Sequence, residues 1–257
     1  SSYRLRWMRK RWLMRARLKG RALKPVQNRT QSLTPRSLLL FATLRNERAR
    51  LPYFLKYYRD LGIEQFLMVD NGSDDGSAEY LAAQPDVSVW STNASYKDAR
   101  YGMDWLNALL RKYAHGRWAL VVDVDEFFLY PFCDTRPLRA LTDWLDDAGL
   151  RSFGTLILDM YPRGPVNDQP CIEGQNPFEI ANWFDRANYS ITRSGQYRNL
   201  WIQGGPRARA FFPKTPRAAP ALNKVPLVKW HRGYTYVSST HMLLPRGLNL
   251  TLSLIHI

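Results

Sequence analysis

The sequence predicts an α/β fold with a mostly parallel sheet flanked by helices, followed by a looser C-terminal region. Apolar runs of strand length alternate with segments whose apolar residues recur at helical spacing, which is typical of strand–helix–strand units. Three of these runs, at 38–44, 66–69 and 118–122, end in polar loops that carry acidic residues. In a parallel sheet such loops share one edge, where open α/β sheets bind ligands.

The order of the elements follows from the same patterns and from turn residues. Gly62 and Gly116 are each placed to end a helix, and Pro137 suits the start of another. Beyond about residue 161, Gly, Pro and Asn become frequent and the pattern loosens. In chain order we expect a strand at 38–44, a helix at 49–61, a strand at 65–69, a helix at 78–83, a strand at 87–91, a helix at 101–115, a strand at 118–122, a helix at 138–148 and a strand at 153–159.

Acidic side chains at the strand ends are the first candidates for a site. Glu47 follows the strand at 38–44, Asp70 ends the next, and Asp123 and Asp125 follow the strand at 118–122. A buried strand that ends in several carboxylates is costly unless a cation meets the charges. We therefore expect these acids to converge in one cleft around a divalent cation, which such oxygen ligands usually share with substrate phosphates.

Three motifs at these positions resemble a known family. They are Leu44-Arg45-Asn46-Glu47, the segment Val-Asp-Asn-Gly-Ser-Asp-Asp-Gly-Ser at 69–77, and Asp123-Val124-Asp125-Glu126-Phe127. In order and spacing they resemble the nucleotide-binding half of family 2-like glycosyltransferases, above all a bacterial subgroup with an Asp-x-Asp-Glu-Phe motif. The resemblance runs from about 38 to 249 and is strongest over 38–131. It implies a Rossmann-like GT-A fold, a nucleotide-diphosphate sugar donor, and Mn²⁺ or Mg²⁺.

The resemblance also implies roles for single residues in donor binding. Asp125 is the best metal candidate, and Asp123 serves the same ion or the ribose hydroxyls. Asp70 and Glu47 match positions that contact the base and ribose. Asp74 is either a further nucleotide contact or the cap of the next helix, and we favour the cap. Arg45 and Arg100 are candidate phosphate partners.

Three later residues are weaker candidates. Asp159 and Asp185 are candidates for the catalytic base, because an inverting transfer needs a carboxylate at the acceptor hydroxyl. His241 is a candidate third metal ligand, since several GT-A enzymes complete their metal site with a histidine from this half.

Together these features predict a metal-dependent sugar transfer to a hydroxyl acceptor. The resemblance implies that the transfer is inverting and that the acceptor is a polysaccharide, a lipid-linked sugar or a surface glycan. One alternative is a sugar-phosphate nucleotidyltransferase, although its usual Gly-rich basic loop after the first strand is missing. The other is a non-catalytic membrane- or nucleic-acid-binding protein led by the basic N-terminus.

The net charge of +15 is concentrated at that end of the chain. Thirteen of the 37 Lys and Arg residues precede Glu47, and no Asp or Glu does, so the remainder holds 24 basic against 22 acidic side chains. Residues 3–24 interleave these cations with two apolar stripes, Leu5/Met8/Trp12 and Trp7/Met14/Leu18. We expect 1–36 to be a basic arm and linker that contacts an anionic membrane surface. A solvated arm or a nucleic-acid arm is the alternative, and no nucleic acid is expected as the partner.

The domain proper is expected at 37–251. Residues 252–257 match the translated end of a sequencing adapter, so we expect a non-native tail; the alternative is a short natural strand. The two cysteines form no disulfide framework, and no apolar stretch has the length of a membrane span. The expected location is cytoplasmic, with peripheral contact at the inner face of the membrane.

Overall fold

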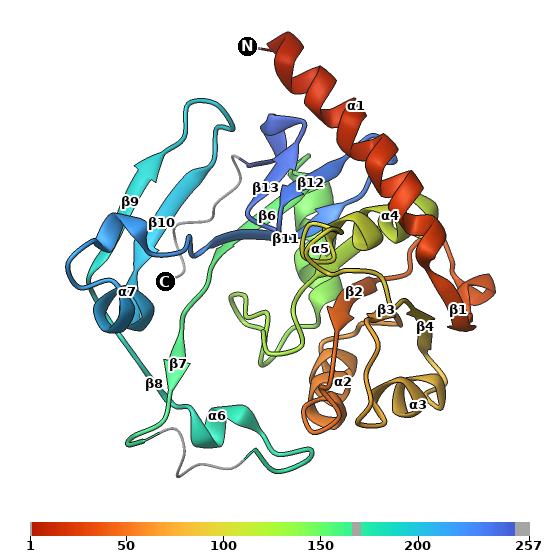
Figure 1. The fold of residues 1–257 in the computed structure, drawn as a ribbon, viewed down its shortest axis with the longest axis horizontal. Helices are drawn as coiled ribbons and strands as arrows, with labels where there is room; N and C mark the ends of the chain where they lie inside the picture. The colour runs from red at the N-terminus through yellow and green to blue at the C-terminus, as the bar shows by residue number, and fades with distance from the viewer. Residues whose placement is uncertain (1, 166–170, 250–257) are drawn as a thin grey trace.

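A seven-stranded sheet is the centre of the computed structural model, which describes residues 2–165 and 171–249 (Figure 1). Its strand order is β1-β4-β3-β2-β5-β11-β6. The four strands β4, β3, β2 and β5 run parallel, and β1 and β11 run antiparallel to their neighbours. The α/β class and the mostly parallel sheet flanked by helices agree with the prediction. The strands are β1 (Lys24–Gln27), β2 (Leu39–Leu44), β3 (Gln65–Asp70), β4 (Val87–Ser91), β5 (Trp118–Val121), β6 (Ser152–Leu156) and β11 (Asn223–Lys229).

Each face of the sheet has its own core. Because side chains alternate along a strand, Leu40 and Ala42 of β2 enter one core, whereas Leu39 and Phe41 enter the other. Helices α2 (Leu51–Asp60), α3 (Ser77–Ala82) and α5 (Leu138–Asp147) contribute to the first core. Helix α4 (Met103–Tyr113) and the hairpin of β12 (Thr235–Ser238) and β13 (Met242–Leu244) contribute to the second.

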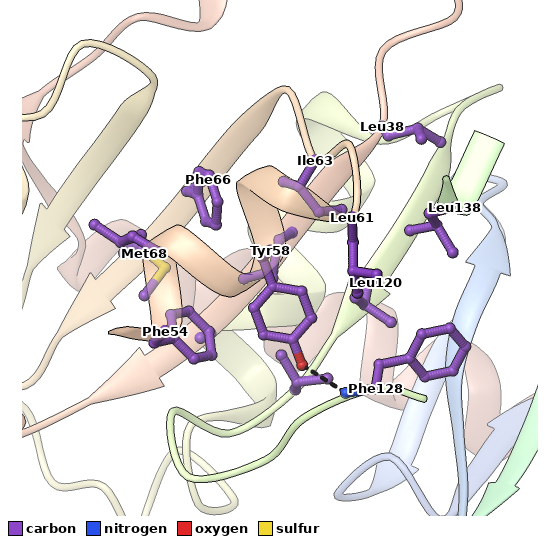
Figure 2. Close-up of a cluster of buried hydrophobic side chains, with 14 of the residues drawn as sticks. Leu38, Phe54, Tyr58, Leu61, Ile63, Phe66, Met68, Leu120, Phe128 and Leu138 are labelled. Carbon is purple, nitrogen blue, oxygen red and sulfur yellow. Dashed lines mark hydrogen bonds between the residues drawn. The ribbon is translucent and has the colours of Figure 1, made fainter. Parts of the chain in front are cut away.

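The first core also holds the acidic loop that follows β5. Tyr58 of α2 is fully buried, and its hydroxyl donates to the Glu126 carbonyl at 2.9 Å. The same hydroxyl accepts from the Phe128 amide at 3.0 Å (Figure 2). The Tyr57 hydroxyl donates to the Phe128 carbonyl at 2.9 Å. Two tyrosines therefore fix the backbone of this loop to α2, which positions the acidic side chains at the sheet edge.

The N-terminal segment is part of the folded body, so the boundary expected at residue 36 does not separate an arm from a domain. Helix α1 (Ser2–Lys19) packs along α4 with Leu5 and Ala16 buried, and strand β1 pairs with β4. The Nε of Arg15 lies 2.7 Å from the Oδ2 of the fully buried Asp104 of α4. The apolar stripe of α1 that contains Leu5 packs on α4, and the sequence pattern of the N-terminal segment does not indicate this contact.

Apart from β11, the region after β6 is built from short strand pairs, as the loosened pattern predicts. Strand β6 ends at Leu156, so Asp159 lies beyond the strand expected at 153–159. Strand β11 was not predicted, because Pro226 lies inside it; a register shift between Lys224 and Leu227 accommodates the proline. The remaining elements are β7 (Met160–Tyr161), α6 (Pro177–Ile180), β8 (Trp183–Phe184), β9 (Tyr189–Arg193), β10 (Leu200–Gly204), α7 (Gly205–Phe211) and the 3₁₀ turns Gly20–Ala22, Thr30–Ser32, Pro216–Ala218 and Arg246–Asn249.

Within 2–165 and 171–249, no helix combines the length and apolarity that crossing a membrane requires. The expected non-native tail at 252–257 lies outside the described residues.

Candidate functional site

A cavity of about 340 Å³ opens at the carboxyl ends of β2, β3 and β5. The parallel register of these strands brings their end loops to the same edge of the sheet. Four predicted site residues, Arg45, Glu47, Asp123 and Asp125, line this cavity, so the predicted convergence of these three loops is present. The other lining residues are Thr43, Leu44, Asn71, Tyr96 and Val124.

Asp125 and Arg45 face the cavity without protein partners. Both side chains are exposed, and neither makes a hydrogen bond or ion pair with any residue in the described ranges. Glu47 differs, because its carboxylate pairs with the Arg50 guanidinium. That pair raises the pKa of Arg50, against the opposing effect of burial. One carboxylate and one guanidinium therefore remain available to a ligand here.

Asp70 is buried at the end of β3, beside the cavity residue Asn71. Its Oδ2 accepts from the amides of Gly72 and Ser73, both at 3.2 Å. Its Oδ1 is buried and has no hydrogen-bond partner in the described structure, and the same holds for Oγ1 of the cavity residue Thr43. Buried polar atoms are rarely left unpaired, so these two oxygens suit a ligand donor or a water molecule.

Asp74 is not the helix cap. Its side chain is exposed and outside the cavity lining, and only its backbone amide is engaged, by Asn46 Oδ1 at 3.0 Å. Asp75 orders the start of α3 instead: its Oδ1 accepts from the amide of Ser77 at 3.0 Å and from the Ser77 hydroxyl at 2.6 Å. The sequence offered two adjacent aspartates, and local pattern alone did not distinguish them.

Lys224 of β11 is a site residue that the sequence interpretation missed. Its Nζ lies 3.0 Å from Asp123 Oδ2 and also contacts the Glu126 carboxylate, and its side chain is 6% exposed. Burial lowers the pKa of Lys224, but the two carboxylates outweigh that effect and leave the pKa above its ordinary value. Since Lys224 and Asp123 lie 101 positions apart, no local motif could have revealed this pair.

Tyr96 is the second missed residue. It follows β4 and lines the cavity, and its ring packs against Tyr101 and Trp105. Because 44% of its surface stays exposed, the ring can still contact a planar or sugar ligand. Burial raises its pKa, and the negative charge of Asp123 adds to the effect. An aromatic residue five positions after the strand at 87–91 was the available signal.

His241 lies near the acidic loop but does not line the cavity. Its Nδ1 donates to the Asn223 carbonyl at 2.5 Å, which leaves Nε2 as the acceptor. Burial lowers its pKa, and Asp123 is among the charges that act on it. No three His, Cys, Asp or Glu side chains form a metal-holding group in the described part of the chain. Asp123, Asp125 and His241 are therefore not gathered as a three-ligand metal site.

The two base candidates are engaged by arginines of α7. The Asp159 carboxylate accepts hydrogen bonds from Nε of Arg207, at 2.7 Å, and from its Nη2. The Asp185 carboxylate accepts hydrogen bonds from two nitrogens of Arg209, both at 3.0 Å. The Arg209 guanidinium holds the pKa of Asp185 below its ordinary value, although burial opposes it. Neither carboxylate lines the cavity, and each is paired with an arginine.

Arg100 is engaged in packing rather than open to phosphate. Its guanidinium contacts Asp104, donates to the Val237 carbonyl at 2.6 Å and stacks over the Trp12 ring at 4.1 Å from the centroid. It is not a lining residue of the cavity. Arg100 therefore joins α1, α4 and β12, and a role in phosphate binding has no support from its position.

No family model matches this sequence. A 115-residue stretch is 25% identical to a rice (Oryza sativa subsp. japonica) protein named as a glycosyltransferase family 92 protein. The alignment covers 42% of this chain and 18% of the rice protein, so the chain spans less than a fifth of that relative's length. The rice protein bears a different family number from the family whose motifs this sequence resembles. The similarity therefore does not identify the family 2-like subgroup.

Proposed function

We propose that this chain is a glycosyltransferase that binds a nucleotide-diphosphate sugar in the cavity and transfers the sugar to a hydroxyl acceptor. The distant relative named as a glycosyltransferase supports this class of activity. The observation that carries the proposal is the unpartnered Asp125 carboxylate, which faces the same cavity as the unpartnered Arg45 guanidinium. The parallel strands that precede this edge are compatible with a GT-A fold, which forms part of the proposal.

The nucleotide would occupy the β2–β3–β4 side of the cavity. The unpaired Asp70 Oδ1 can accept from a base N–H or a ribose hydroxyl, and the Glu47 oxygen that Arg50 leaves free can accept from hydroxyls. The Tyr96 ring offers a stacking face for the base. Arg45 can hold the diphosphate through charge-assisted hydrogen bonds. The polar atoms in these roles are left without a hydrogen-bond partner by the described residues, and the Tyr96 ring is partly exposed.

Mn²⁺ or Mg²⁺ is the proposed cofactor. The donor set fits such an ion modestly: Asp125 is unpartnered, and Asp123 uses only Oδ2 in its contact with Lys224, so Oδ1 remains. Mg²⁺ commonly takes one or two carboxylates and completes its shell with water and substrate phosphates. When bound, the ion would neutralise charge on the leaving diphosphate.

Lys224 would keep the acidic loop compatible with an anionic donor. Its ammonium offsets the charges of Asp123 and Glu126, which otherwise repel a diphosphate. The same contacts orient Asp123, while the tyrosines of α2 hold the loop backbone. The loop thus presents Asp125 to the ligand with Lys224 offsetting one of the two neighbouring negative charges.

For the acceptor step we propose Asp159 as the base in an inverting transfer. Its partner Arg207 has a raised pKa, mainly because of the hydrogen bond to Asp159. The charges of Glu126 and Asp125 add smaller contributions, so the Arg207–Asp159 pair lies within electrostatic range of the acidic loop. A carboxylate has about four acceptor positions, so a bidentate arginine leaves room for a hydroxyl proton. Asp185 lies on the more exposed pair and is the second choice.

Calorimetric titration of UDP and GDP, with Mn²⁺ and with EDTA, tests the proposal. We expect metal-dependent binding of one nucleotide and at least a tenfold weaker affinity in Asp125→Asn. Asp134→Asn is the matched control, because Asp134 is exposed on the same connection but does not line the cavity. A folded chain that binds neither nucleotide would overturn the proposal. Release of pyrophosphate from a nucleoside triphosphate and a sugar phosphate would favour the nucleotidyltransferase alternative.

A further inference from the structure

Helix α1 carries two apolar stripes on opposite sides. At about 100° per residue, Leu5, Trp12 and Ala16 fall on one side of the helix and Trp7, Met14 and Leu18 on the other. The first stripe faces the body of the protein, where Leu5 is 6% exposed and Ala16 1%. The second stripe is exposed, because the packing on α4 leaves it uncovered by the described residues.

Four large side chains form this exposed stripe. Tyr3 is 72% exposed, Trp7 63%, Met14 64% and Leu18 53%. They lie within an arc of about 60° on the helix. Helix α1 lies at the periphery of the molecule, where its outer side faces away from the sheet (Figure 1). Large apolar side chains gathered in one row on a surface mark an interaction site more often than scattered ones do.

Exposed cations flank the stripe on both sides. None of them makes an ion pair with a residue in 2–165 or 171–249, and no acidic residue occurs before Glu47. They lie within about 60° of the stripe at the same helical pitch. The flanking residues are Arg6, Lys10 and Arg17 on one side and Arg4 and Arg11 on the other.

A groove continues from this face toward β13. It has a volume of about 520 Å³, and Leu5, Leu244 and Pro245 give it apolar walls. Arg6, Arg9, Lys10 and Arg246 also line it. Two of these cations, Arg6 and Lys10, also flank the exposed stripe. An apolar groove lined by four cations suits a group with an anionic head and an apolar tail.

We propose that α1 docks the protein on an anionic lipid bilayer, with Tyr3, Trp7, Met14 and Leu18 inserted at the headgroup level. A helix that lies in the interface combines this kind of apolar stripe with flanking Lys and Arg. Tyr and Trp favour the interface, because each has an apolar body and a polar tip. A nucleic acid would engage the same cations but gives no role to Met14 and Leu18. The inference does not depend on the proposed sugar transfer.

Sedimentation with phosphatidylcholine vesicles, with and without phosphatidylglycerol, tests the proposal on the full chain. We expect binding to the anionic vesicles that weakens as salt rises. The variant Trp7→Ser/Met14→Ser should bind them at least about tenfold more weakly. Trp144→Ser is the matched control, because Trp144 of α5 is 57% exposed and lies on a different helix. Circular dichroism establishes that each variant is folded.

Two results would overturn the proposal. The first is equal vesicle binding by Trp7→Ser/Met14→Ser and the wild type, which would show that the stripe does not insert. The second is binding to duplex DNA with no binding to anionic vesicles, which would assign the cations to a nucleic acid.

Discussion

The strands that form the floor of the cavity are buried on both faces, whereas the short strands β8 and β9 expose most of their side chains. Leu40 and Phe41 of β2 are fully buried, but Trp183 and Ile191 in β8 and β9 are each 50% exposed. Core packing fixes the first region. In the second, ion pairs such as Arg209–Asp185 join elements whose apolar burial is small.

This difference matches the demands of a two-substrate transfer. A rigid set of strands below a nucleotide site favours tight binding and fast reaction, because the binding groups are already positioned before the ligand binds. An acceptor site formed by exposed strands can adapt to a larger glycan. The proposed donor side is thus held by the fold, and the proposed acceptor side by a few polar side chains.

Truncation of one apolar side chain in each region should give the largest contrast. Leu40→Ala removes a fully buried side chain and should lower the free energy of unfolding by about 3 kcal/mol. Ile191→Ala removes a half-exposed side chain and should change it by less than about 0.5 kcal/mol. Urea unfolding followed by circular dichroism measures both. Equal losses would show that the exposed strands share the core, and the two regions would no longer differ in what holds them.

The second contrast separates two lysines on the same strand. Lys224→Met leaves the Asp123 and Glu126 carboxylates without their cation. We expect the free energy of unfolding to fall by about 2 kcal/mol, a figure that already allows for the exposure of Asp123. Lys229→Met removes a surface pair with Asp146 and should cost less than about 1 kcal/mol.

The pH dependence of stability gives an independent check on Lys224. Because the folded pKa of Lys224 lies above its ordinary value of 10.5, its contribution is complete below pH 10.5 and is lost as pH rises through the folded pKa. The wild type should therefore lose stability above that pH more steeply than Lys224→Met does. Parallel curves would show that Lys224 does not stabilise the acidic loop.

The parallel half of the fold could be predicted because its signals are local. An apolar run followed by Asp123 indicates both a strand and its end, and the parallel order places that end beside Asp70. The positions of Glu47, Asp123 and Asp125 on one cavity follow from this geometry. Strand β11 could not be predicted in the same way, because Pro226 and the polar start at Asn223 argue against a central strand.

The arginine partners of Asp159 and Asp185 could not be predicted, for a different reason. Asp159 and Asp185 looked like free carboxylates in the sequence, but Arg207 and Arg209 neutralise them from 48 and 24 positions away. Such pairs depend on where α7 lies relative to the segments that carry the two acids, and nothing in the local pattern around either acid indicates that arrangement.

The smallest expected effect concerns two exposed ion pairs, one in each region. Arg209→Ala breaks the pair with Asp185 and should leave the urea midpoint unchanged, because this ion pair lies at the surface. It should nevertheless speed amide hydrogen exchange over 183–193, since few buried contacts hold this segment closed.

Lys56→Ala breaks a comparable pair with Asp60 on α2, where Phe54 and Tyr58 are fully buried. Exchange in α2 should stay as in the wild type, because the core and not the ion pair protects that helix. Unchanged exchange in both variants would mean that the exposed strands have another source of stability, and the distinction between the two regions would then be one of exposure alone.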